Sequence, residues 1–117
     1  MPYRSAVKRF GLVGHPVGHS VSPAMMRAAF EALGVACSYE AIDAPDEAAL
    51  AGVIGALRAG ELEGLNVTLP HKRAALRMAD SAGEMAARSG AANVLVREAG
   101  GKIRAENTDA VAIVRVL

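Results

Sequence analysis

The chain has 117 residues, a formal net charge of +1 and 52% hydrophobic residues, while aromatic residues make up only 3%. This length fits one globular domain, and the composition is far from that of a disordered protein. The near-neutral charge and the scarcity of aromatic side chains argue against a nucleic-acid partner, which would need a basic surface or stacking side chains.

Cysteine content and hydropathy bear on the compartment in which the protein works. The single cysteine, Cys37, cannot form an intramolecular disulfide, and no Cys or His cluster has the spacing of zinc ligands. The N-terminal stretch has no signal-peptide pattern, and no uncharged apolar run reaches the roughly 18 residues that span a bilayer. We therefore expect a cytoplasmic protein with no membrane partner.

The first half of the chain alternates between predicted strands and helices. Residues 9–14 are an apolar run that ends in glycine, which indicates a buried strand, and the following loop is rich in Gly, Pro and Ser. Ser22 followed by proline is typical of a helix start, and apolar residues then repeat at helical spacing up to Gly34. Residues 37–43 are a second predicted strand, and the spacing after them predicts a helix that ends at Gly60.

The second half continues this alternation and adds a hairpin. Residues 65–69 are the third predicted strand, and residues 71–80 and 81–90 are predicted to form two short helices. Two strands around the AlaGlyGly turn at 99–101 form an expected hairpin, and Thr108 is the expected cap of a final apolar helix. This order predicts an α/β fold, an open three-layer and mostly parallel sheet with helices on both faces and one antiparallel strand.

Polar side chains gather where the predicted strands end or begin. Ligands of open parallel sheets bind beyond the carboxyl ends of the strands, where loops and helix N-termini meet. Hydroxyl and amide side chains together suit a small anionic ligand that carries several hydroxyl groups, and a lysine beside an aspartate can move a proton. The residues in question are His19, Ser20, Ser22, Asn66, Thr68, Lys72, Asn93, Asn107, Thr108 and Asp109.

Each of these residue types also has a purely structural interpretation. Serine and threonine are typical helix caps, and asparagine often satisfies the backbone of a turn. A lysine or an aspartate in the first turn of a helix is common, the aspartate because the helix dipole favours it. Hydrogen-bonding roles, and no metal, are expected for the histidines, which lack metal-ligand spacing: His15, His19 and His71.

Four motifs occur together and in order, GHPVGHSVSP, GLNVTLPHK, SGAANVL and ENTDA. In this combination, and at these separations, they closely resemble the substrate-binding domain of shikimate dehydrogenase. That family interconverts 3-dehydroshikimate and shikimate with NADP, a step of aromatic amino-acid biosynthesis. The resemblance covers the chain from about Phe10 to its end and implies an amino-acid-dehydrogenase-like N-terminal domain.

The resemblance implies roles for the polar residues. Ser20 and Ser22 would hold the substrate carboxylate, and Lys72 and Asp109 would be the catalytic pair. Hydride transfer to a ketone builds negative charge on its oxygen, which a nearby cation or acid must stabilise and then protonate. The residues expected around the ring oxygens of the substrate are Asn66, Thr68, Lys72, Asn93 and Asp109.

The sequence departs from the family pattern at four positions. Val94 stands where the family usually has threonine, and Met26 stands where a histidine is frequent. Ala110 and Ala112 replace glycines that are common after AsnThrAsp. Loss of the threonine hydroxyl is expected to weaken a hydrogen bond behind the site, at a cost of about 1 kcal/mol. These departures bear on efficiency more than on identity.

The cofactor site is expected outside this chain. No GxGxxG loop follows a strand here, whereas the family binds NADP in a second, Rossmann-type domain. We therefore expect residues 1–117 to be a shikimate-binding catalytic domain, without the NADP-binding domain and inactive by itself. Apolar residues of the final helix are candidate contacts with a partner chain, including a second copy in a homodimer: Val111, Ile113, Val114 and Val116.

Two alternatives remain open at this point. A quinate or aminoshikimate dehydrogenase has the same scaffold, although the two serines favour shikimate, because quinate carries an additional hydroxyl that needs room nearby. A non-catalytic module that binds a shikimate-like acid is the other alternative. Such a module would need Ser20, Ser22 and Asn93, whereas Lys72 and Asp109 would be dispensable.

Overall fold

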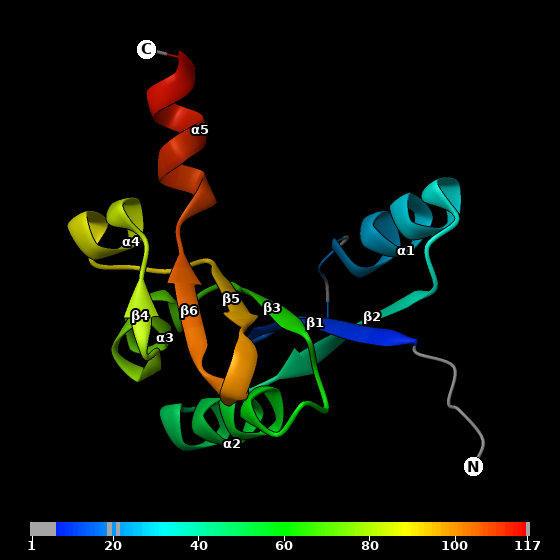
Figure 1. The fold of residues 1–117 in the computed structure, drawn as a ribbon, viewed down its shortest axis with the longest axis horizontal. Coiled ribbons are helices and arrows are strands. Elements are labelled where there is room, and N and C mark those ends of the chain that lie inside the picture. The colour runs from blue at the N-terminus through cyan, green and yellow to red at the C-terminus, as the bar shows by residue number, and fades with distance from the viewer. Residues whose placement is uncertain (1–6, 19, 21, 117) are drawn as a thin grey trace.

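A six-stranded sheet runs through the molecule (Figure 1). The computed structural model describes residues 7–18, 20 and 22–116. Its strands are β1 (Lys8–Gly14), β2 (Cys37–Asp43), β3 (Gly64–Val67), β4 (Ser81–Ala82), β5 (Val94–Arg97) and β6 (Ile103–Glu106). Their order across the sheet is β2-β1-β3-β5-β6-β4, so the first strand of the chain lies in the interior of the sheet.

Within the described residues, β5 is the one strand that runs against the others. β1 pairs in parallel with β2 and β3, and β4 pairs in parallel with β6. β5 lies between β3 and β6 and is antiparallel to both. Because β5 and β6 are joined by a short 3-10 turn at Ala99–Gly101, they form the predicted hairpin.

The helices divide between the two faces of the sheet. They are α1 (Ser22–Leu33), α2 (Glu47–Arg58), α3 (Lys72–Met78), α4 (Glu84–Ser89) and α5 (Thr108–Val116). α1 packs on β1 and β2 from one face, whereas α2 and α3 lie on the other face (Figure 1). α4 contacts β6, and α5 starts beyond the end of β6 and extends away from the sheet. The predicted fold class, a mostly parallel sheet with helices on both faces and one antiparallel strand, is confirmed.

Side-chain alternation along the strands produces two cores of unequal size. Successive strand residues point to opposite faces, so Val13 joins the core beneath α2 and α3, while its neighbour Leu12 joins the core beneath α1. The α1 core is small and aromatic, and it also contains Tyr39 and Val17, with Phe10, Met26 and Phe30 packed against them. The largest fully buried side chains of the other core are Leu50, Leu57, Leu95, Ile103 and Val13.

The segment predicted as a helix over residues 81–90 has a different structure, and that prediction was wrong in its first part. Ser81–Ala82 form β4, and the helix begins at Glu84. The two residues of β4 pair with Arg104 and Ala105 of β6. Strand formation here depends on a partner that is distant in sequence, and local apolar spacing carries no signal of it.

The cap of α5 also differs from the prediction. Thr108 is the first residue of the helix, and Asn107 makes the capping contact, because its Oδ1 accepts a hydrogen bond of 2.9 Å from the N–H of Ala110. The Asn107 amide nitrogen donates to Ser89 Oγ and to the carbonyl oxygen of Ala91, both at 3.0 Å. Asn107 therefore joins the start of α5 to the last residue of α4 and to the chain that follows it.

The exposed side chains of α5 bear on the expected contact with a partner chain. Val116 is 80% exposed, whereas the side chains of Val111, Ile113 and Val114 lie outside the described part of the structure. The homodimer therefore stays a prediction. Among the described residues, no helix combines the length and the apolar character that crossing a membrane requires.

Asp80 connects three parts of the fold, and its substitution provides a test of fold stability. The Asp80 carboxylate accepts hydrogen bonds from the N–H of Ile103, at 2.8 Å, and from the guanidinium of Arg58. The Ile103 N–H first, and then the Arg58 guanidinium, hold the pKa of the Asp80 carboxyl below its ordinary value of 3.8. A carboxyl with a lowered folded-state pKa stabilises the protein above its unfolded-state pKa, and this stabilisation is lost as pH falls through the folded-state value.

We predict that Asp80→Asn lowers the urea midpoint of unfolding near neutral pH, because the asparagine keeps an acceptor for Ile103 but loses the charge opposite Arg58. The difference from the unsubstituted protein should shrink as pH falls below about 4, because the Asp80 carboxyl is then protonated first in the unfolded state and, at a lower pH, in the folded state as well. Urea unfolding of both proteins at several pH values measures this difference in midpoint. A difference that is the same at every pH would contradict this assignment.

Candidate functional site

A cavity of about 300 Å³ opens on the α1 side of the sheet, near the carboxyl ends of β1 and β3. Its volume lies at the lower end of the range for small-molecule sites. The apolar part of its wall is made by Leu12, Met25, Met26, Val67 and the ring of Tyr39. The polar part is made by predicted site residues, namely Ser22, Asn66, Thr68, Lys72, Asn93 and Asp109.

Strand geometry brings two of the asparagines to this cavity. Leu65 and Val67 are buried in the larger core, so Asn66 between them points to the opposite face, toward α1. β5 is antiparallel to β3, so the residue that precedes β5, Asn93, lies beside the end of β3. Its carbonyl oxygen accepts a hydrogen bond of 2.8 Å from the N–H of Val67.

Lys72 is held at the cavity by the residue before it. His71 is 3% exposed, and its Nε2 lies 2.6 Å from the carbonyl oxygen of Ala44, which follows β2. The His71 N–H donates to the carbonyl oxygen of Thr68 at 3.1 Å. These two hydrogen bonds hold the turn between β3 and α3 in place. Lys72, the first residue of α3, therefore has a defined position.

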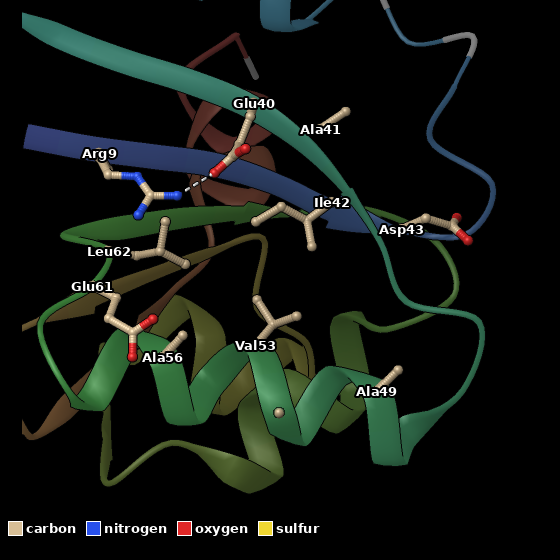
Figure 2. Close-up of a pocket in the computed structure, with 11 residues that line it drawn as sticks. Arg9, Glu40, Ala41, Ile42, Asp43, Ala49, Val53, Ala56, Glu61 and Leu62 are labelled. Carbon is tan, nitrogen blue, oxygen red and sulfur yellow. Dashed lines mark hydrogen bonds and ion pairs between the residues drawn. The ribbon is translucent and has the colours of Figure 1, made fainter.

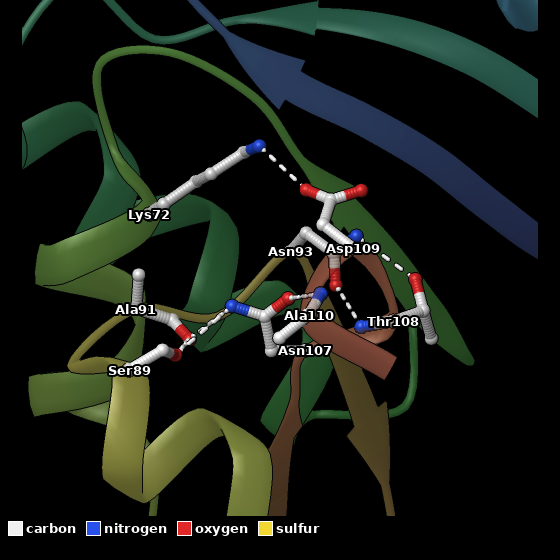
Figure 3. A network of polar contacts seen from close by, with 8 residues as sticks. All are labelled: Lys72, Ser89, Ala91, Asn93, Asn107, Thr108, Asp109 and Ala110. Atoms are coloured by element: carbon white, nitrogen blue, oxygen red, sulfur yellow. Dashed lines mark hydrogen bonds and ion pairs between the residues drawn. The ribbon is translucent and has the colours of Figure 1, made fainter. Parts of the chain in front are cut away.

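Lys72 and Asp109 meet although 37 positions separate them in the sequence. The ammonium nitrogen Nζ of Lys72 lies 2.9 Å from Oδ2 of Asp109 (Figure 3). Their side chains are 33% and 62% exposed, and an ion pair this open to solvent contributes only about 0–1 kcal/mol to stability. Fold stability therefore does not explain the pair, which leaves an ammonium and a carboxylate accessible from the cavity.

Asn93 and Thr108 position the start of α5 over the cavity. Asn93 Nδ2 donates to Thr108 Oγ1, and Asn93 Oδ1 accepts from the Thr108 N–H, both at 2.9 Å (Figure 3). Such a reciprocal pair fixes the orientation of the amide and the position of the helix start. Asp109 is the next residue, so these two hydrogen bonds also determine where its carboxylate lies.

The two serines have different positions. Ser22 is half-buried and lines the cavity. Ser20 is exposed, does not line the cavity in this structure, and accepts a hydrogen bond of 3.2 Å from the N–H of Ser22 on its Oγ. His19, in the same loop, lies outside the described residues.

The other two histidines have hydrogen-bond partners. His15 Nδ1 lies 2.9 Å from Oδ1 of Asp43, and His71 contacts the Ala44 carbonyl as described above. Within residues 7–18, 20 and 22–116, no cluster of three or more His, Cys, Asp or Glu side chains is arranged to hold a metal ion.

Tyr39 is a cavity residue that the sequence analysis did not identify. Its hydroxyl donates a hydrogen bond of 2.7 Å to Asn66 Oδ1. Burial raises the pKa of this hydroxyl, so it stays protonated and remains a donor. A signal was available, because a tyrosine in a strand that is expected to be buried needs a partner for its hydroxyl. Neither spacing nor residue type indicated that Met25 and Met26 would line the cavity.

A second hollow lies on the other face, between α2 and the β1–β2 side of the sheet (Figure 2). It is larger, about 550 Å³, but no predicted site residue lines it. Arg9 and Glu40 on its wall pair with each other at 2.8 Å and are both about half exposed (Figure 2). The charges of Arg9 and Glu40 thus satisfy each other, and the predicted proton-transfer groups do not line this hollow.

Comparison with known proteins assigns the family. Residues 12–95 match the family model described as the shikimate dehydrogenase substrate binding domain. The chain belongs to the shikimate dehydrogenase family. The resemblance carried by the four sequence motifs is thereby confirmed.

Similar shikimate dehydrogenases are longer than this chain. A shikimate dehydrogenase (NADP(+)) from Methanopyrus kandleri is 47% identical over 107 residues, which are 92% of this chain and 36% of the relative. The one from Rubrobacter xylanophilus is 46% identical over 99 residues, 85% of this chain and 34% of the relative.

A solved structure of shikimate 5-dehydrogenase from Thermus thermophilus, in complex with NADP(H) and shikimate, has the same fold. It superposes with a TM-score of 0.85 and 43% sequence identity, over 95% of this chain and 41% of that chain. The chain therefore spans between about a third and two fifths of the length of the shikimate dehydrogenases that it matches.

Gly14 provides a test of how this fold holds Thr68. A Cβ atom on Gly14 would lie 2.3 Å from Thr68 Cγ2 and 2.8 Å from the carbonyl oxygen of Leu69. We predict that Gly14→Ala displaces Thr68 and lowers the free energy of unfolding by about 1–3 kcal/mol, as overpacking does. Urea unfolding and the backbone NMR shifts of Thr68 measure both effects.

Gly18→Ala is the matched control, because a Cβ atom on Gly18 would meet nothing within 4 Å. It should leave both the unfolding free energy and the shifts of Thr68 nearly unchanged. Equal effects of the two substitutions would contradict a specific packing role for Gly14.

Proposed function

We propose that this domain binds shikimate and 3-dehydroshikimate and forms the substrate-binding half of an NADP-dependent shikimate dehydrogenase. The observation that carries the proposal is the 2.9 Å contact of Lys72 with Asp109 in a cavity whose wall also presents hydroxyl and amide groups. The names of the relatives, and the shikimate in the Thermus thermophilus complex, support the choice of ligand.

The residues proposed to bind the substrate fall into two groups by chemistry, and all of them except Ser20 line the cavity. The hydroxyls of Ser20 and Ser22 bind the substrate carboxylate, and the start of α1 beside them adds a favourable dipole. To reach the ligand, the Ser20 hydroxyl gives up the hydrogen bond that it accepts from the Ser22 N–H and forms one with the substrate carboxylate instead. Amide and hydroxyl groups bind the ring oxygens, namely Asn66, Thr68 and Asn93.

Lys72 carries the proton in this proposal. In the direction of ketone reduction, negative charge develops on the ketone oxygen, and the Lys72 ammonium stabilises it by a charged hydrogen bond and then transfers a proton to it. In the opposite direction, the neutral amine accepts the proton of the substrate hydroxyl. Asp109 holds the Lys72 side chain in place through the contact at Oδ2.

The residues of this chain do not fit a site for the NADP phosphates. No G-x-G sequence occurs in the chain, so it lacks the glycine loop on which a dinucleotide-binding turn depends. The steps assigned to this domain are therefore substrate binding and proton transfer. NADP as the cofactor of the complete enzyme is supported by the names of the relatives.

The cellular setting belongs to the same proposal. The single cysteine, Cys37, supports a cytoplasmic enzyme, because it forms no disulfide within the chain. Exposed Val116 on α5 supports contact with a partner chain, which we infer to be a second copy in a homodimer.

We predict that shikimate binds the isolated chain weakly and at the cavity described above. Titration followed by ¹H–¹⁵N NMR should move the signals of residues such as Asn66, Thr68 and Asn93, whereas those around the α2 groove, such as Val53 and Ala56, stay in place. The same chain should give no NADP-dependent rate. Movement centred on the α2 groove would contradict the site, and measurable turnover would contradict the division of labour between domains.

We predict that Lys72→Met in the complete enzyme that contains this domain lowers kcat by about 10²–10⁴-fold, because a group that transfers the proton is lost. Asp109→Asn should lower kcat less, because the ammonium is retained but less well oriented. KM for shikimate should change much less than kcat in both variants. Steady-state kinetics with shikimate and with quinate measure these effects and separate the two dehydrogenase activities.

Lys8→Met is the control for the loss of a lysine, since Lys8 is exposed at the start of β1, away from the cavity. It should leave kcat unchanged. If Lys72→Met left shikimate affinity intact and no activity depended on Lys72, a non-catalytic binding module would be the better description.

A further inference from the structure

Asn66 meets the cavity with an amide whose orientation is set from behind. Its Oδ1 accepts the hydrogen bond of 2.7 Å from the Tyr39 hydroxyl, and both side chains line the cavity. With the oxygen engaged in this way, the Nδ2 group is the part of the amide left to face a ligand. An amide nitrogen is a donor only, so this part of the wall offers N–H groups.

Among the described residues, Tyr39 is the one side chain that hydrogen-bonds to the Asn66 amide. Val94 lies directly opposite Asn66 on β5, where the family usually has threonine, and it has no polar atom. Side chains directly opposite each other in an antiparallel pair are the closest neighbours on a sheet face. In this chain, therefore, the Tyr39 hydroxyl sets the orientation of the Asn66 amide. A threonine hydroxyl at position 94 would also influence that orientation.

Tyr39 itself has little freedom to adopt another arrangement. It is 3% exposed in the α1 core, its ring centroid lies 6.5 Å from that of Phe30, and its carbonyl oxygen accepts a 2.7 Å hydrogen bond from Arg27. A flipped amide would turn Nδ2 toward the hydroxyl, which would then accept a hydrogen bond while its own proton had no acceptor among the side chains of this core. The other side chains of this core carry no oxygen or nitrogen acceptor: Phe10, Leu12, Val17, Met26 and Phe30.

We propose that Tyr39 is a positioning residue that keeps Asn66 a hydrogen-bond donor toward the ligand, so that this wall selects a ligand oxygen that accepts. This inference rests on the proposed function, because it specifies what Asn66 does there. A ketone oxygen and a hydroxyl oxygen both meet the requirement, and an ammonium group in the same place does not, since it can only donate. The cavity thus favours a hydroxy or keto acid over its amino counterpart.

The first test replaces only the hydroxyl, with Tyr39→Phe in the isolated chain and shikimate as the probe. We expect the side-chain NH₂ signals of Asn66 to shift before any ligand is added, and the affinity for shikimate to fall about fivefold, as expected for one lost neutral hydrogen bond. Phe30→Leu is the control, because it loosens the packing of the same ring but keeps the hydroxyl. It should lower stability and leave the affinity unchanged.

The second test is a double-mutant cycle that separates positioning from an independent effect. In an Asn66→Leu background, where no amide is left to orient, Tyr39→Phe should cause no further loss of shikimate affinity. This background also serves if Tyr39→Phe alone does not fold, because removing both hydrogen-bond partners is better tolerated than removing one. A further loss of affinity in that background would overturn the proposal.

The remaining outcomes separate this proposal from the proposed function. If the unsubstituted chain binds shikimate and Tyr39→Phe binds it equally well, Tyr39 does not act through Asn66. Equal losses of affinity in Tyr39→Phe and Phe30→Leu would also overturn the proposal, since packing alone would then explain them. If the unsubstituted chain does not bind shikimate, the proposed function fails. The positioning role is then decided by the Asn66 NH₂ signals, which must shift in Tyr39→Phe for it to stand.

Discussion

The direction of the strands is the constraint on which the site depends. β1, β3 and β6 run the same way, so the chain leaves all three at one edge of the sheet. β5 runs the opposite way between β3 and β6, and the chain therefore enters it at this same edge. Residues from four distant segments, near positions 22, 66–72, 93 and 109, reach one cavity for this reason.

Hydrogen bonds made by His71 and Asn93 hold this arrangement, and the charged pair contributes little to it. His71 anchors the turn before Lys72 on the Ala44 carbonyl, and Asn93 anchors the start of α5 through Thr108. An unpaired polar group is costly where it is buried, as His71 is, and the Asn93–Thr108 pair fixes its geometry by two reciprocal hydrogen bonds. The exposed contact of Lys72 with Asp109 is worth about 0–1 kcal/mol and can be exchanged for contacts with a ligand at little cost to the fold.

Much of the fold and of the candidate site could be read from local patterns. The strand at residues 37–43, the helix that starts at Ser22 and the hairpin around 99–101 all have the predicted positions. The polar residues were found because motif residues at strand ends are recognisable as types, although their roles in binding and catalysis stay predictions. Local patterns missed β4, because its pairing with β6 depends on a segment distant in sequence. They also assigned the cap of α5 to Thr108 instead of Asn107, because asparagine and threonine are both common cap residues and stand side by side here.

The sequence by itself determined most of the segments that become strands and helices, which faces are apolar and which polar groups are available, because these follow from residue type and from periods of two and 3.6 residues. Tertiary structure alone decided which of those groups meet. The contact between Lys72 and Asp109 spans 37 positions, and the hydrogen bond between Tyr39 and Asn66 spans 27. No local period encodes contacts at such separations, since they arise only when strands distant in sequence pair in one register and present their side chains to the same face.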